Sequence, residues 1–90
     1  MKLNDAIRRF LEYTEVEKNQ SEKTLENYQH YLGRFREFAG NIDVSRITLD
    51  LVHKYRLNLS RRKLGVKTQN YHVIALRAFL KYLIKNDIKT

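Results

Sequence analysis

Three histidines, ten carboxylates and six tyrosines are the side chains in this sequence that could support catalysis or metal binding. His30, His53 and His72 lie far apart, and no two have the one-turn spacing of a helical metal-binding pair. We expect His30 and His72 on polar helix faces. The carboxylates crowd the first half in a pattern typical of solvated faces, and the isolated glycines form no phosphate loop. The residues therefore predict a binding protein without a metal site, a cofactor or catalytic residues.

Five of the six tyrosines fall into two groups. Tyr28, Tyr55 and Tyr82 lie on or beside apolar stripes, which predicts rings packed in the core with their hydroxyls at its rim. Tyr31 and Tyr71 lie off those stripes, so we expect them to be free to meet a sugar-phosphate backbone or a base edge.

Positive charge is concentrated in the second half of the chain. Residues 1–50 contain eight Lys/Arg and nine Asp/Glu, a net charge of −1, whereas residues 51–90 contain ten Lys/Arg and only Asp87, a net charge of +9. A surface that is merely soluble mixes both signs. The excess therefore indicates a polyanionic partner, with nucleic acid favoured over a membrane surface or an acidic protein.

Length and composition indicate one cytoplasmic domain. Ninety residues fit a single domain, and the chain has no cysteine for disulfides or thiolate metal sites. No apolar run approaches the ~20 residues of a membrane span, and the charged start lacks the apolar core of a signal peptide. The absence of proline and the scarcity of glycine favour an all-α fold.

Apolar residues recur at helical spacing in four segments, which predicts a compact bundle of four or five helices. The expected helices span about residues 3–17, 21–40, 48–63 and 68–85. Ser21, Thr48 and Thr68 are expected N-caps, and Gly40 is an expected C-cap. The residues after Asn86 read as the start of a linker.

Three motifs in this order resemble the SAM-like core-binding domain of tyrosine recombinases and phage integrases. The longest, S-x-x-T-L-x-x-Y-x-x-x-L-x-x-F, covers residues 21–35; Ile47-Thr48 with Val52 and Tyr55 follows; T-x-N and A-L-R-x-F-x-x-Y-L occupy residues 68–70 and 75–83. The sequence departs from the common family pattern at Tyr71 and His72, where basic residues are frequent.

The resemblance implies that residues 1–90 are one domain that binds double-stranded DNA, while a separate catalytic domain, absent from this chain, carries out recombination. It implies contact through the N-terminal parts of the second and fourth helices. The expected DNA-binding residues are Lys23, Thr24, Asn27, His30, Tyr31, Arg34, Lys67, Thr68, Asn70, Tyr71, Arg77 and Lys81. Lysines and arginines suit phosphates, while Asn27, Asn70 and Tyr71 suit base edges or sugars.

An alternative interpretation is a basic helical module that binds a protein. Leu49 and Leu57 are apolar but lie off the inner face of the third helix, where they could contact another protein or a neighbouring recombinase subunit. The basic run Arg61-Arg62-Lys63 either borders the DNA or only caps the third helix. We expect the isolated domain to be monomeric.

Overall fold

Residues 1–86, which the computed structural model describes, form four α-helices and one short 3-10 helix. They are α1 (Leu3–Val16), α2 (Glu22–Ala39), η1 (Val44–Arg46), α3 (Leu49–Arg61) and α4 (Val66–Lys85). The expected all-α bundle is confirmed, with η1 as its fifth helical element. The expected start of a linker lies outside the described residues.

The ends of α2 and the start of α3 follow the expected capping chemistry. The Ser21 hydroxyl accepts a hydrogen bond from the Thr24 amide at 3.3 Å, and the Thr48 hydroxyl accepts one from the Leu51 amide at 3.1 Å. Gly40 ends α2 with a φ of +80°, a backbone conformation that residues with a Cβ rarely adopt. Both ends of α2 and the start of α3 therefore have the caps that the sequence predicts.

The predicted start of α4 is wrong by two residues. The helix begins at Val66, after Gly65, and no side chain caps it. Thr68 lies inside the first turn, where its carbonyl bonds to the His72 ring at 2.7 Å. Thr68 is thus a helical residue, and α4 carries unpaired amides at its start.

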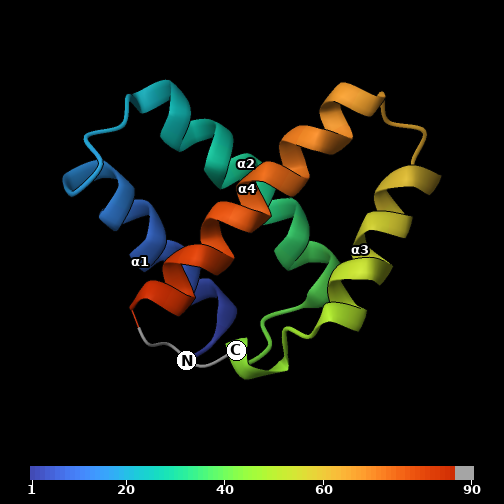
Figure 1. Ribbon diagram of the computed structural model, residues 1–90, viewed down its shortest axis with the longest axis horizontal. Helices are drawn as coiled ribbons and strands as arrows, with labels where there is room; N and C mark the ends of the chain where they lie inside the picture. The colour runs from blue at the N-terminus through green and yellow to red at the C-terminus, as the bar shows by residue number, and fades with distance from the viewer. Residues whose placement is uncertain (87–90) are drawn as a thin grey trace.

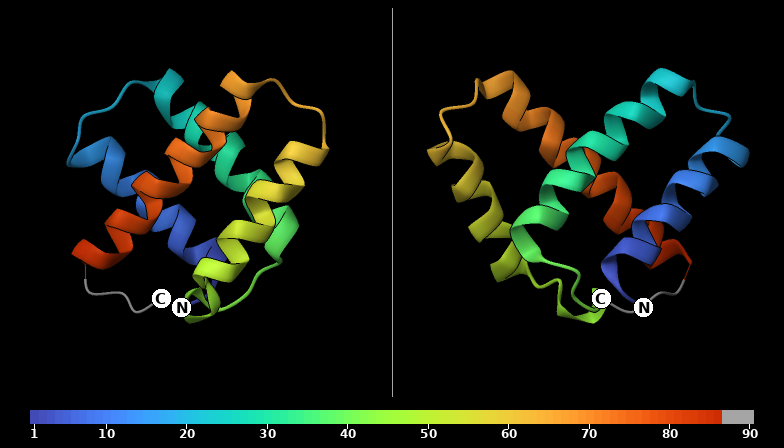
Figure 2. Two further views of the ribbon diagram at one scale, coloured as in Figure 1. Left: turned by 45° about the vertical axis from the view of Figure 1, so that its right-hand side comes forward. Right: turned by 180° about the vertical axis from the view of Figure 1, so that it is seen from behind.

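Two of the four helices, α2 and α4, form a cross, and α1 and α3 flank it (Figure 1). α2 and α4 cross near their middles, and their N-terminal halves diverge toward the same end of the molecule. α1 and α3 lie on opposite sides of this cross, each packed against both α2 and α4, as the front and rear views show (Figure 2). This arrangement leaves the two diverging N-terminal halves at one end of the bundle, which we call the open end of the cross.

One aromatic side chain from each helix forms the centre of the core. Phe10, Phe35, Tyr55 and Phe79 are at most 2% exposed. The Phe10 and Phe79 rings pack edge to face with centroids 5.7 Å apart, and Phe35 and Tyr55 do so at 5.0 Å. Such pairs add about 0.5–1.5 kcal/mol to the burial of their area. The first pair joins α1 to α4, and the second joins α2 to α3.

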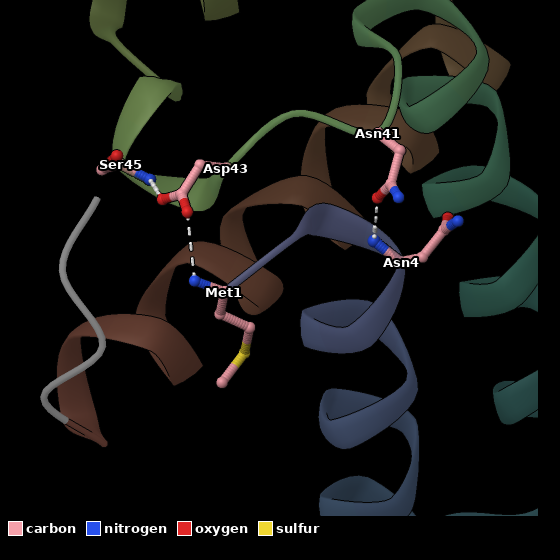
Figure 3. A network of polar contacts seen from close by, with 5 residues as sticks. All are labelled: Met1, Asn4, Asn41, Asp43 and Ser45. Atoms are coloured by element: carbon pink, nitrogen blue, oxygen red, sulfur yellow. Dashed lines mark hydrogen bonds and ion pairs between the residues drawn. The ribbon is translucent and has the colours of Figure 1, made fainter.

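A polar network ties the start of α1 to the connection after α2 (Figure 3). The Asp43 carboxylate accepts hydrogen bonds from the Ser45 amide at 3.0 Å and from the Met1 amine at 3.1 Å. These bonds hold the pKa of Asp43 well below its usual range. The Asn41 side chain accepts a further bond from the Asn4 amide at 2.9 Å. The network holds the start of α1 against the segment that joins α2 to η1.

Candidate nucleic-acid interface

The diverging N-terminal halves of α2 and α4 carry eight of the twelve expected DNA-binding residues (Figure 1). The other four lie in the C-terminal halves: Tyr31 and Arg34 just past the middle of α2, and Arg77 and Lys81 on α4. Among residues 1–86 no group of three metal-ligating side chains gathers, and no helix combines the length and apolar character of a membrane span.

On α2, the candidate residues differ in how far they reach solvent. Lys23, Asn27 and His30 are exposed, whereas Thr24 and Arg34 are half-buried. The Thr24 amide is already bonded to the Ser21 hydroxyl, and the two hydroxyl oxygens lie 3.1 Å apart. A phosphate at this end of α2 would thus meet the Thr24 hydroxyl and the amides that precede it, rather than the Thr24 amide itself.

On α4, the first two turns present their polar side chains to solvent. Lys67, Thr68 and Asn70 are exposed, and Tyr71 is 48% exposed. Because no side chain caps α4, its first amides and the positive end of its helix dipole add to the charge of Lys67. This end of the helix attracts anions more strongly than the acid-containing start of α2, where Glu22 lies in the first turn.

Where α2 and α4 cross, four ring side chains from the two helices meet, and we call them the crossing cluster: His30, Tyr31, Tyr71 and His72. Tyr31 stacks on Tyr71 with centroids 6.3 Å apart, and the Tyr31 and His72 rings are 4.6 Å apart. Tyr31 is half-buried and packs against the core, so the expectation that its ring is free holds only in part. Tyr71 remains the accessible aromatic of the cluster.

The expectation of a polar-face position is wrong for His72, which is 2% exposed. Its Nδ1 lies 2.7 Å from the Thr68 carbonyl oxygen, which can only accept, so Nδ1 carries the proton. Burial lowers the pKa of His72, and the nearby Arg34, His30 and Arg62 lower it further against the opposing Thr68 bond. His72 is therefore a neutral core residue whose Nε2 is an acceptor without a partner in residues 1–86.

The sequence contains the signal for this burial. His72 precedes Leu76, Phe79 and Leu83 by four, seven and eleven residues, which is the spacing of the α4 core stripe. The polarity of imidazole, rather than its position in the stripe, led to the wrong expectation.

The expected rim position is also wrong for the hydroxyl of Tyr55. This side chain is 0% exposed, and its hydroxyl is buried without a hydrogen-bond partner among residues 1–86. Burial raises its pKa to about 12, although Arg34 and Arg62 act in the opposite direction. Nothing in the spacing of the stripe distinguishes a buried tyrosine hydroxyl from one at the rim.

Arg77 and Lys81 are exposed but do not join the crossing cluster. Arg77 lines a groove between α3 and α4 together with Val52 and Arg56. Lys81 lines a separate hollow between α1 and α4 beside Tyr13. The structure thus separates these two cations from the residues on the diverging helix ends.

None of the candidate cations is neutralised by a carboxylate within residues 1–86. The ion pairs there join the Met1 amine to Asp43, Arg8 to its helix neighbours on α1, and Lys54 to Asp50 on α3. The positive charge of α4 is therefore left available to an external anion.

This chain is similar to known proteins over almost its whole length. The sequence family described as phage integrase, N-terminal SAM-like domain, matches residues 7–87. The tyrosine recombinase XerC of Anoxybacillus flavithermus is 29% identical over 89 residues, covering 96% of this chain and 30% of the relative. XerC of Pelotomaculum thermopropionicum is 32% identical over 90 residues, covering 91% of this chain and 29% of the relative.

A third relative, XerC of Leptospira interrogans, is 28% identical over 89 residues, covering 96% of this chain and 29% of its own length. This chain therefore spans about 30% of the length of the curated relatives it matches. No solved structure matches it. The order of the helices and the match over residues 7–87 together show that the chain belongs to the family of SAM-like N-terminal domains of phage integrases.

Proposed function

We propose that this domain grips duplex DNA with the diverging N-terminal halves of α2 and α4, as the DNA-holding part of a tyrosine recombinase. The observation that carries the proposal is the uncapped, acid-free start of α4, with Lys67 exposed beside Tyr71 at the open end of the cross. Its relatives are named tyrosine recombinases, and the chain spans about 30% of their length. In this proposal the remainder of such a protein supplies the catalytic domain, and the 90 residues bind DNA without cutting it.

The two helices have different tasks in this proposal. α4 supplies the electrostatic attraction through Lys67 and its first amides, which suit phosphates. α2, which begins in the near-neutral half, supplies position and polar contacts through Asn27 and His30. Asn70 and Tyr71 lie where they can meet a base edge or a sugar.

Binding of a fluorescent duplex, followed by anisotropy over a series of KCl concentrations, tests the proposal. Wild-type protein should bind weakly and lose affinity as salt rises, because phosphate contacts release counterions. Lys67→Gln should weaken binding to all sequences and lower the salt slope by about one. Arg9→Gln is the matched control, since Arg9 is an exposed cation on α1. Equal effects of the two substitutions would contradict the assigned surface.

The absence of cutting is tested separately. Supercoiled plasmid incubated with the purified 90-residue protein should remain intact, because in this proposal the catalytic tyrosine and the cations around it belong to the remainder of the recombinase. Relaxed plasmid, or protein covalently joined to DNA, would overturn this part of the proposal.

A second candidate function is protein binding through the α3–α4 groove. Leu49 and Ile84 border this groove and are 73% and 72% exposed, and Arg56 and Arg77 add positive charge to it. The candidate partner is another recombinase subunit. In that case Leu49→Ser should reduce cooperative binding of the full-length recombinase to a two-site duplex while leaving DNA binding by the isolated domain unchanged. Sedimentation should show the isolated domain as a monomer.

A further inference from the structure

A hollow between α1 and α4, with a volume of about 400 Å³, has a floor of aromatic rings. The Phe10 ring of α1 packs against Tyr28 of α2, with centroids 5.4 Å apart, and against Tyr82 of α4 at 5.5 Å. Tyr13 extends this row, with its centroid 4.9 Å from that of Tyr82. The three tyrosines are half-buried, so part of each ring is accessible. Rings from three helices thus form one continuous apolar surface.

Three exposed lysines line the same hollow, which we call the α1–α4 hollow. Lys18 follows α1, and Lys81 and Lys85 lie one turn apart on α4. The Lys85 Nζ donates a hydrogen bond to the Tyr13 hydroxyl at 3.3 Å and lies 5.9 Å from the centroid of the Tyr13 ring. These contacts place one ammonium group directly beside the aromatic floor.

The turn after α1 holds Lys18 at the hollow. The Gln20 amide donates a hydrogen bond to the Thr14 carbonyl at 3.2 Å, so the chain folds back against the end of α1. Asn19 permits this turn with a φ of +50°, a conformation that asparagine adopts more readily than most residues. Thr14 and Gln20 line the hollow together with Lys18.

No carboxylate balances these three lysines. None lines the hollow, and no ion pair joins Lys18, Lys81 or Lys85 to an acid within residues 1–86. Lys85 lies in the last turn of α4, where a cation also offsets the helix dipole, but Lys81 lies one turn too early for that effect. The hollow therefore combines an apolar floor with unbalanced positive charge, which suits an anion that has an apolar part.

DNA does not match this combination. The phosphates of a duplex would meet the lysines but leave the apolar floor uncovered, and Lys67 lies about 21 Å from Lys81 along the axis of α4, at ~1.5 Å per residue. A base of single-stranded DNA stacks on a free ring face. Here Tyr82 packs against Tyr13 on one side and the core on the other, and the Lys85 ammonium lies over the Tyr13 ring. An aliphatic side chain requires only apolar surface.

We propose that the α1–α4 hollow binds an acidic peptide segment of a partner protein. A bulky aliphatic side chain of this segment packs on the aromatic floor, and carboxylates on either side of it pair with Lys18, Lys81 and Lys85. Exposed ion pairs contribute little individually, so the affinity depends on the apolar anchor and the lysines together. This inference goes beyond the proposed DNA binding, and it assigns Lys81 to the peptide rather than to DNA.

Fluorescence anisotropy at low salt tests the inference with a short labelled peptide that has glutamates on both sides of one leucine. Wild-type protein should bind this peptide. Lys81→Gln and Lys85→Gln should each weaken binding by about two- to five-fold, the range for loss of an exposed ion pair. Lys63→Gln is the matched control, because Lys63 is an exposed lysine that follows α3, and it should change the affinity by clearly less. Lys67→Gln, which weakens DNA binding in the proposed function, should also leave peptide binding nearly unchanged.

A second peptide, with serine in place of the leucine, tests the aromatic floor. It should bind about ten-fold more weakly, because serine has little apolar area to bury. Equal binding of the two peptides, or equal losses for Lys63→Gln and Lys81→Gln, would overturn the inference. So would a finding that DNA displaces the peptide and that Lys81→Gln weakens DNA binding as much as Lys67→Gln, because the hollow would then belong to the DNA-binding surface. Failure of the wild-type protein to bind duplex DNA would refute the proposed function but not this inference.

Discussion

At the scale of single residues, the junction of α2, α3 and α4 combines buried neutral groups with nearby cations. His72 is kept neutral by burial and by the nearby Arg34, His30 and Arg62, although its bond to the Thr68 carbonyl favours the charged ring. Protonation of this ring would add a buried charge to a region that is already positive. The neutral ring is therefore more stable in this buried position than the charged ring would be.

His72 should therefore make stability fall in mild acid. Its pKa is lowered from 6.5 on folding, so below about pH 6.5 the unfolded chain takes up a proton that the folded chain cannot. The free energy of unfolding should decrease as pH falls from 7 to 5, by at most about 1.4 kcal/mol per pH unit for this group. His72→Gln should flatten that part of the profile in urea melts, whereas His53→Gln at an exposed position should not. The lowered pKa of Asp43 acts in the same direction, but only near and below 3.8, outside this window.

The Tyr55 hydroxyl should contribute nothing to stability. It is buried without a partner, and removal of such a group relieves a desolvation cost. Tyr55→Phe should leave the free energy of unfolding unchanged or raise it by up to about 2 kcal/mol. Phe35→Ala, a cavity beside the same ring, should cost about 3–5 kcal/mol. A loss above 1 kcal/mol for Tyr55→Phe in denaturant melts would mean that the hydroxyl has a partner in solution.

At the scale of elements, the apolar spacing and the caps were sufficient to predict α1, α2 and α3 closely. Ser21 and Thr48 could be identified as caps because each precedes an apolar repeat, and both side chains bond to amides as expected. Thr68 has the same sequence context, yet α4 begins at Val66 with Gly65 at its N-cap, which leaves Thr68 inside the helix. Residue type alone could not decide between these two start positions, because a helix start without a side-chain cap depends on what the preceding loop packs against.

The two threonines give a direct comparison of cap and helical residue. Thr48→Ala should lower the free energy of unfolding by about 1 kcal/mol, because it leaves the Leu51 amide without its acceptor. Thr68→Ala should change stability by a few tenths of a kcal/mol at most, since its side chain caps nothing and alanine favours a helix. Denaturant melts of the two variants decide the point, and a larger loss at Thr68 would contradict the observed start of α4.

At the scale of the whole molecule, the sequence predicted which helix faces carry polar residues, but not which of those faces lie on the same side of the molecule. Lys67, Asn70 and Tyr71 lie in the N-terminal half of α4, the part of the helix that the family resemblance implies. Arg77 and Lys81 lie on α4 too, yet they line separate hollows beside α3 and α1. A helical repeat places residues on a face of their own helix, whereas the partners of that face depend on how the helices cross.

The central claim is that DNA lies against the open end of the cross, and an NMR titration of ¹⁵N-labelled protein with a short duplex tests it most directly. At low salt, the largest amide shifts should fall in residues 22–34 of α2 and 66–74 of α4. The shifts should vanish as salt is raised, since the attraction depends on counterion release. Shifts confined to α1 and the α3–α4 groove, or no shifts at low salt, would contradict the account.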